Sequence, residues 1–229
     1  MAKKVIVLSL GGSLIVPNKI NVEFLEELKK VLMKNRKKYR FVVVCGGGSV
    51  ARNYINGLDE QRISKKFLYQ SFLGIGCTRM NARFMTYFFG NDANSGIPHD
   101  MKEVEGLLRR NDFVFCGALR YSKNQTSDST AAKLARYFDS PFINMTNVKG
   151  LFDKNPKKFR SAKFIPEISH KDFYKMVKKI SFKPGQHFVL DQTAAKIIKK
   201  YGVKTYILGS NKDLDKLLKA KHFVGSVIG

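Results

Sequence analysis

Two glycine clusters that follow short apolar runs are the clearest candidates for phosphate chemistry in this 229-residue chain. Gly11, Gly12 and Ser13 come directly after the run Lys4–Leu10, and residues 46–49 (GGGS) come after residues 41–45. Glycine lets the backbone approach an anion closely, and a helix that starts there offers unpaired N–H groups and the positive end of its dipole. Neither cluster has the spacing of a P-loop or of a dinucleotide-binding turn. The pair favours an anion site of another kind, although tight strand-to-helix turns would explain each cluster by itself.

Three charged residues stand near these turns or before later helices. Arg52 lies about one turn into the helix expected after the second glycine cluster. Its guanidinium could fold back over an anion with the bidentate geometry that suits phosphate, and a plain surface arginine is the alternative. Asp128 and Asp191 stand just before the helical runs 130–138 and 193–201. Because Asp is a preferred N-cap, their positions alone favour capping.

Short apolar runs alternate with amphipathic segments, and the elements they form must position these residues. The predicted strands are Lys4–Leu10, 41–45, Phe113–Cys116, 141–145 and 203–208. The predicted helices are one capped by Asn21, one from about residue 49, and the stretches 65–89, 130–138 and 193–201. Between residues 147 and 166 the pattern breaks into Gly, Pro and Lys, which indicates a hairpin or lid. We therefore expect an α/β fold with an open, mainly parallel sheet between helices, and ligands at the carboxyl ends of its strands.

Composition excludes several classes of protein. Hydrophobic residues make up 44% and aromatic residues 12% of the chain, which excludes a disordered chain. No apolar run approaches the roughly 20 residues that a membrane span needs, and the N-terminus shows no signal-peptide pattern, so we expect a cytoplasmic protein with no membrane partner. Cys45, Cys77 and Cys116 are odd in number and flanked by apolar residues, which predicts buried, reduced thiols.

The formal net charge is +24, from 42 Lys and Arg against 18 Asp and Glu. Such a charge fits a nucleic-acid binder, an enzyme with an anionic substrate, or a lysine-biased surface. The basic residues are mostly Lys and are spread along the chain, whereas a nucleic-acid surface usually combines Arg with stacking aromatics on one face. A solvated lysine surface is therefore favoured, and we do not expect nucleic acid as a partner.

Several blocks of sequence occur in a characteristic order. They are VIVLSLGGS, VVVCGGGSVAR, TSDSTAA, TNVKGLFDKNPKK and VLDQTAAKII. Together with LGIGCTRMNA at residues 73–82 and the final GSVIG, they resemble the amino acid kinase family and, within it, the archaeal-type uridylate (UMP) kinases. The resemblance covers nearly the whole chain, and the TNVKGLFDKNPKK block is its most specific part.

The resemblance implies an α/β/α sandwich without a P-loop that moves the γ-phosphoryl group of ATP, with Mg²⁺, to UMP. The product would be UDP, made for pyrimidine nucleotide synthesis, and the enzyme would be a homo-oligomer, usually a hexamer. The resemblance also implies one domain over residues 1–229. A soft division near residue 120 would separate an N-terminal lobe that binds the acceptor from a C-terminal lobe that binds ATP. Such a transfer needs positioning and cationic stabilisation more than covalent help from the protein.

By the same resemblance, individual residues take roles at the two ends of the site. The residues expected to bind UMP are Gly46, Gly47, Arg52, Ser71, Thr126 and Ser127. The residues expected to bind ATP are Gly11, Gly12, Ser13, Thr146, Phe152 and Asn155, with Pro156 beside them. The residues expected in catalysis are Asp128, beside the transferred group, and Asp191, which would orient the basic groups there. No metal ligand is expected, since His99, His170, His187 and His222 show no metal-ligand spacing.

The chain departs from the family pattern at single positions. Ser9 stands where many relatives have a Lys that reaches the transferring phosphoryl group, so another cation must act there, and Lys4 and Lys149 are candidates. Ser71 stands where a carboxylate is expected to contact the acceptor ribose. Lys149 and Asn155 each replace an expected Asp. These changes make the site more positive and weaken its expected discrimination of the ribose.

The loop over residues 116–128 also departs, because it lacks the usual proline and is about two residues longer. These departures leave two alternatives to a UMP kinase. One is an enzyme of the same fold that phosphorylates a different small acid or phosphate. The other is a non-catalytic protein that binds nucleotides or nucleic acid.

Overall fold

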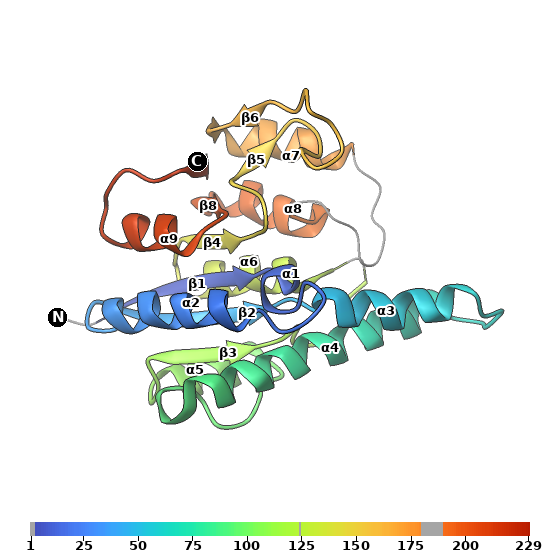
Figure 1. Cartoon of the computed structure of the whole chain (residues 1–229), viewed down its shortest axis with the longest axis horizontal. Helices are drawn as coiled ribbons and strands as arrows, with labels where there is room; N and C mark the ends of the chain where they lie inside the picture. The colour runs from blue at the N-terminus through green and yellow to red at the C-terminus, as the bar shows by residue number, and fades with distance from the viewer. Residues whose placement is uncertain (1–2, 124, 180–189) are drawn as a thin grey trace.

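A seven-stranded sheet forms the centre of the computed structural model, which describes residues 3–123, 125–179 and 190–229 (Figure 1). Its strands are β1 (Lys4–Leu10), β2 (Tyr39–Cys45), β3 (Phe113–Cys116), β4 (Phe142–Met145), β7 (Glu167–Ile168), β8 (Thr205–Leu208) and β9 (Gly225–Ile228). Their order is β3-β2-β1-β4-β8-β9-β7. All neighbouring pairs are parallel except β8 and β9. The predicted open, mainly parallel sheet is confirmed.

Helices cover both faces of this sheet. They are α1 (Gly12–Ile15), α2 (Val22–Asn35), α3 (Gly48–Asp59), α4 (Lys66–Phe89), α5 (Met101–Leu108), α6 (Ser127–Tyr137), α7 (His170–Lys178), α8 (Gln192–Tyr201) and α9 (Asn211–Leu218). Along β1, Ile6 and Leu8 belong to the core cluster that includes side chains of α2, α4 and α9, whereas Val7 belongs to the cluster that includes side chains of α5, α6, α7 and α8. The strand is thus buried on both sides, which explains its continuous apolar run.

Most of the helices and strands predicted from the sequence are confirmed. The bounds predicted for β1 and β3 agree with the structure, and Asn21 caps α2 by accepting from the backbone N–H of Phe24 at 3.4 Å. The stretch 147–166 contains the predicted hairpin, formed by the antiparallel strands β5 (Leu151–Phe152) and β6 (Phe164–Ile165). Cys45, Cys77 and Cys116 are free and buried, as predicted. None of the helices described here is long and apolar enough to span a membrane.

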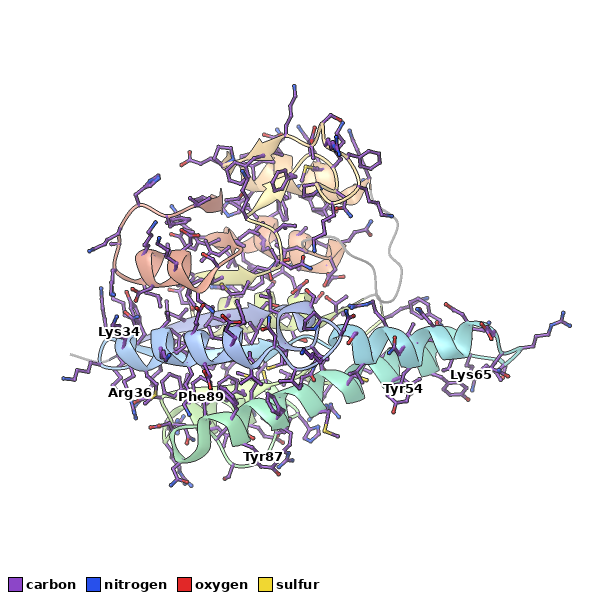
Figure 2. The ribbon with its side chains drawn as sticks, in the orientation of Figure 1. Lys34, Arg36, Tyr54, Lys65, Tyr87 and Phe89 are labelled. Atoms are coloured by element: carbon purple, nitrogen blue, oxygen red, sulfur yellow. The ribbon has the colours of Figure 1, made fainter. Side chains whose placement is uncertain are left out.

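Helices α3 and α4 run together beyond the rest of the molecule, with Lys65 at the turn between them (Figures 1 and 2). The other end of α4 belongs to the core. Phe89 is 2% exposed and packs against Phe115, with ring centroids 4.7 Å apart, whereas Tyr87 is 72% exposed. One 24-residue helix therefore connects the core to the projecting end.

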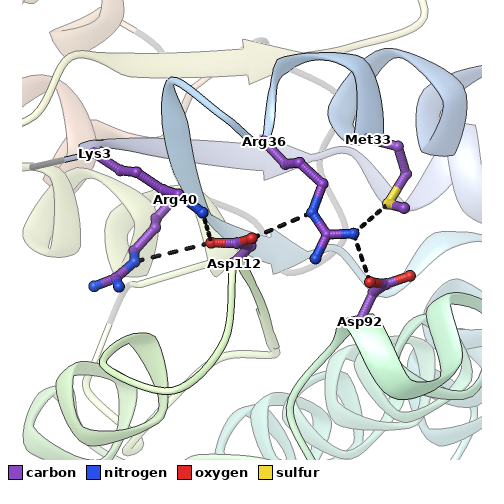
Figure 3. A network of polar contacts seen from close by, with 6 residues as sticks. All are labelled: Lys3, Met33, Arg36, Arg40, Asp92 and Asp112. Atoms are coloured by element: carbon purple, nitrogen blue, oxygen red, sulfur yellow. Dashed lines mark hydrogen bonds and ion pairs between the residues drawn. The ribbon is translucent and has the colours of Figure 1, made fainter. Parts of the chain in front are cut away.

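A network of charged side chains ties the strands together at the end of the sheet where β1 and β2 begin (Figure 3). The carboxylate of Asp112 accepts from Lys3 at 2.5 Å and from Arg36 at 3.2 Å, and Arg40 Nε lies 4.0 Å away. Arg36 also reaches Asp92 at 2.7 Å. Burial alone would raise the pKa of Asp112, but the hydrogen bonds from Lys3 and Arg36 hold it below its usual value. Part of the positive charge thus stabilises the fold.

The two glycine clusters pack directly against each other where β1 and β2 end. A Cβ atom at Gly12 would lie 1.9 Å from the backbone nitrogen of Gly48, and one at Gly46 would lie 2.4 Å from that of Gly12. Gly48 also has φ +68°, a conformation that favours glycine. These glycines are therefore required by the approach of one backbone to the other, whatever they bind.

We predict that Gly12→Ala lowers the free energy of unfolding by about 3 kcal/mol or more, because the new methyl group meets backbone that cannot move aside. The matched control is Gly76→Ala in α4, where a Cβ has no neighbour within 4 Å. That change should stabilise the protein by about 1 kcal/mol through helix propensity. Urea unfolding of both variants checks this, and equal stabilities would contradict the packing argument.

Candidate active site

A cleft of about 720 Å³ opens where β1, β2, β3 and β4 end. All the predicted site residues line it, including those assigned to opposite ends of the site. They are Gly11, Gly12, Ser13, Gly46, Gly47, Arg52, Ser71, Thr126, Ser127, Asp128, Thr146, Phe152, Asn155, Pro156 and Asp191. Ligand pockets of proteins commonly have volumes of about 300–1,000 Å³. The fold brings together residues that the sequence separates by up to 180 positions.

The glycine turns and the start of α3 form one anion-compatible wall of this cleft. The N-cap of α3 is Gly47, which offers no side-chain cap, and the first turn of the helix carries no acid. The backbone N–H of Ser49 donates to the carbonyl of Val16 at 3.0 Å. What this helix start offers an anion is therefore its positive dipole end rather than a full set of free N–H groups. Arg52, half-buried in the same helix, lines the cleft close to this helix start.

Asp128 reaches the cleft from the first turn of α6, but it is not the N-cap of that helix. Thr126 is the cap and accepts from the backbone N–H of Asp128 at 3.1 Å, so the capping interpretation of Asp128 is wrong. The carboxylate instead accepts from the hydroxyl of Ser9 in β1 at 2.6 Å. Burial, reinforced by the charge of Asp191, raises the pKa of Asp128 to about 7, while the Ser9 hydrogen bond opposes the rise.

Asp191 joins the N-terminal ends of two helices. It caps α8 by accepting from the backbone N–H of Ala194 at 2.8 Å, which confirms the capping prediction. It also accepts from Thr126 Oγ1 at 2.6 Å and from Ser129 Oγ at 2.6 Å, and its exposed fraction is 4%. Its two oxygens are therefore occupied by the protein, and it holds Thr126 and α6 in place. The proton of the Thr126 hydroxyl is likewise already donated.

The loop after β3 forms the wall near Ser71 and contributes residues that sequence reasoning missed. Its backbone lies on α4, where Ala118 donates to Thr78 Oγ1 at 2.9 Å and Arg79 donates to the carbonyls of Ala118 and Leu119. The loop brings Arg120, Tyr121, Ser122 and Gln125 to the cleft. The extra length noted in the sequence is the signal that could have indicated them.

Side chains at this end of the cleft form a hydrogen bond and a ring contact within the protein. The hydroxyl of Ser71 donates to the carbonyl of Phe67 at 2.8 Å. The Tyr121 ring packs edge-on against Phe72, with centroids 5.3 Å apart. This wall is therefore built from hydroxyl and aromatic groups rather than from the carboxylate that the resemblance leads one to expect.

The β5–β6 hairpin supplies the opposite wall and most of the positive charge. On this side the cleft is lined by Thr146, Phe152 and Asn155. The side chains beside them are those of Lys154, Lys157 and Lys158. The Asn155 side chain accepts from the backbone N–H of Lys157 at 2.9 Å and so shapes the turn that carries these lysines. Sequence reasoning missed all three lysines as site residues, although the block that contains them was singled out.

Neither candidate cation lines the cleft. Lys4 is exposed at the start of β1, at the opposite end of the strand from the glycine turn. Lys149 is exposed and lies over the ring of Phe164, 5.0 Å from its centroid, outside the residues that line the cleft. The cations that line the cleft within the described ranges are Arg52, Arg120, Lys154, Lys157 and Lys158, and the acids are Asp128 and Asp191.

The histidines lie at scattered places. His99 and His222 are exposed, and the ring of His170 contacts the carbonyl of Val203 at 3.1 Å. His187 lies outside the described residues. Across the part of the chain that the structure describes, no three His, Cys, Asp or Glu side chains form a group that could hold a metal ion.

Comparison with known proteins identifies the family. A family model described as the amino acid kinase family matches residues 4–209. The chain belongs to the amino acid kinase family. Among curated relatives of this amino acid kinase, the uridylate kinase of Archaeoglobus fulgidus is 36% identical over 226 residues, covering 97% of this chain and 99% of the relative. The uridylate kinase of Methanococcus aeolicus is 31% identical over 224 residues, covering 95% and 96%.

Solved structures agree with this assignment. The crystal structure of the Archaeoglobus fulgidus uridylate kinase matches with a TM-score of 0.82 and 34% identity, covering 99% of this amino acid kinase and 100% of the other chain. A UMP kinase from Ureaplasma parvum matches with a TM-score of 0.77 at 19% identity over the full length of both chains, which shows the shared fold. The α/β/α architecture implied by the sequence is confirmed.

We predict that Asp128→Asn raises the melting temperature at pH 8 by about 10 °C and has little effect at pH 4. The pKa of Asp128 is about 7 in the folded protein and near 4 when unfolded. Its ionisation therefore costs stability as the pH rises from 4 to 7, and Asn removes this cost. Thermal melts across this range check the prediction.

The control is Asp172→Asn in α7, an exposed acid whose pKa is lowered by the Ser169 hydrogen bond and then by Lys175. Ionisation of this acid stabilises the folded protein instead of destabilising it, so the Asn variant should not have a higher melting temperature at pH 8. A stabilisation by Asp128→Asn that did not change with pH would contradict the titration argument.

Proposed function

We propose that the chain is a nucleoside monophosphate kinase of the uridylate kinase type. An oxygen of the UMP phosphate would attack the γ-phosphorus of ATP, the bond from that phosphorus to the β–γ bridging oxygen would break, and UDP and ADP would leave. The observation that carries this proposal is the joint placement of the predicted acceptor and donor residues in one cleft. Relatives named uridylate kinases, 31–36% identical over 95% or more of this chain, support the choice of acceptor.

In this proposal the two nucleotides bind on opposite sides of the cleft, with their phosphate groups at the two glycine turns. Gly46, Gly47 and Arg52 hold the phosphate of UMP, with Ser71, Thr126 and Ser127 beside its nucleoside. Gly11, Gly12 and Ser13 hold the ATP phosphates, and Thr146, Phe152, Asn155 and Pro156 lie beside the adenosine. The acceptor-binding and ATP-binding lobes would then meet near residue 120, in the loop that lies on α4.

The charges of the cleft suit a transfer between two phosphate chains. Phosphoryl transfer requires in-line positioning and cations near the three equatorial oxygens of the moving group. Arg52 supplies a cation on the acceptor side, and the lysines of the hairpin turn supply cations on the other side. Asp128 lines the same cleft and would orient the groups around the transferred phosphoryl. Asp191 would act through Thr126 and α6, as a positioning residue.

The proposal includes Mg²⁺ as the partner of ATP. Bound Mg²⁺ would neutralise charge on the β- and γ-phosphates. Magnesium of this kind is held largely by the substrate phosphates and water, and no protein ligand is assigned. The family resemblance further supports a homo-oligomer, a hexamer by resemblance, and a cytoplasmic role in pyrimidine nucleotide synthesis.

A coupled assay of ADP release tests the proposal with UMP, CMP, dUMP and small non-nucleotide phosphates as acceptors. UMP is expected to give the highest kcat/KM. A small phosphate as the preferred acceptor would instead favour the second candidate function, which the wall around Ser71 and Tyr121 motivates. Absence of acceptor-dependent turnover with every nucleotide would overturn the kinase assignment.

We predict that Arg52→Ala raises the KM for UMP about 10–100-fold and lowers kcat much less, since a hydrogen-bonded charge pair contributes about 1.5–3 kcal/mol to binding. Steady-state kinetics with saturating ATP check this. The control is Arg109→Ala, which removes an exposed arginine paired with Glu105 and should leave KM unchanged. An equal rise in both variants would indicate a general effect of net charge.

A further inference from the structure

Ser9 is a buried polar residue in an otherwise apolar stretch of β1. Its side chain has an exposed fraction of 0%, and it pairs with Val44 of β2 on one side and Asn144 of β4 on the other. Side chains alternate along a strand, so Ser9 shares a face with Val7, which packs against the helices α6 and α8. A hydroxyl in such a place requires a hydrogen-bond partner.

The partner is Asp128, 119 residues further along the chain. Ser9 Oγ donates to Asp128 Oδ1 at 2.6 Å, a distance typical of a charge-assisted O–H···O⁻ bond. The bond joins β1 to the first turn of α6, at the edge of the cleft.

Among the described residues, two charged side chains act near this pair, Asp191 and Lys133. Asp191, just before α8, has like charge and opposes ionisation of Asp128. Lys133 of α6 donates to Gln125 Oε1 at 2.6 Å, toward the loop. Thr126 donates its hydroxyl proton to Asp191 and contacts only the backbone N–H of Asp128.

We propose that Ser9 is a positioning residue of the phosphoryl-transfer centre, whose hydroxyl fixes the Asp128 carboxylate in the cleft and favours its ionised form. The proposal rests on the proposed function for its catalytic part. Ser9 does not supply the charge of a lysine; it sets the orientation and the proton affinity of the acid that faces the substrates. The neutral hydroxyl of Ser9 thereby links the end of β1 to the Asp128 carboxylate in the cleft.

The first experiment needs no nucleotide and therefore stands apart from the kinase assignment. The titration of the Asp128 carboxyl group is followed by ¹³C NMR in the wild-type protein, Ser9→Ala and Ser9→Thr. Removing a hydrogen bond to the ionised form should raise the pKa by about one unit in Ser9→Ala, and Ser9→Thr should restore it because its hydroxyl remains. An unchanged titration in Ser9→Ala would overturn the proposal, whatever the protein phosphorylates.

The second experiment is the pH profile of kcat with UMP and ATP. If Asp128 acts in its ionised form, the shift of one unit should make Ser9→Ala about tenfold slower than wild type at pH 6 and nearly equal at pH 9. Asp128→Asn serves as the reference, because adding Ser9→Ala to it should cost little more. A loss in Ser9→Ala that is the same at every pH would indicate a purely structural role and overturn the proposal. A wild-type protein that phosphorylates no nucleotide would count against the proposed function alone.

Discussion

The contact between the two glycine turns is the constraint on which the rest of the site depends. Gly12 and Gly48 approach so closely that a methyl group on Gly12 would lie 1.9 Å from the next backbone. This approach fixes the ends of β1 and β2 relative to each other and sets where α1 and α3 begin. Asn81 of α4 reinforces it by donating to the carbonyl of Gly46 at 2.7 Å. Anion binding and close packing thus require the same residue type at the same positions.

Charge is used differently at the two ends of the sheet. Where β1 and β2 begin, Asp112 gathers Lys3, Arg36 and Arg40 around one carboxylate and so links separate segments of chain. Where they end, the cleft holds two acids that interact mainly with neutral donors, while its cations remain on the walls. The excess of +24 therefore includes charges that are compensated within the fold and charges that face a site suited to phosphates.

The sequence was informative where a local pattern determines structure and uninformative where contacts span the chain. The bounds of β1 and β3 follow from apolar runs that end in glycine or polar residues. Helices α7 and α9 were missed because they are short and rich in lysine, although Ser169 with Asp172 and Ser210 with Asp213 are capping pairs that signal them. The site residues could be listed from family motifs, but the bond between Ser9 and Asp128 leaves no trace in spacing. The position of Lys149 over Phe164 likewise depends on how the hairpin folds.

Helix α4 connects the hydrophobic core to one side of the cleft. One end is anchored by Met85 and Phe89 in the core, the middle holds both the Gly46 turn and the loop after β3, and the far part carries Ser71 beside the cleft. At 1.5 Å per residue, its 24 residues form a rod about 36 Å long. A tilt of about 5° about the anchored end would displace the far end by about 3 Å. The position of Ser71 beside the cleft therefore depends on the angle at which α4 leaves the core.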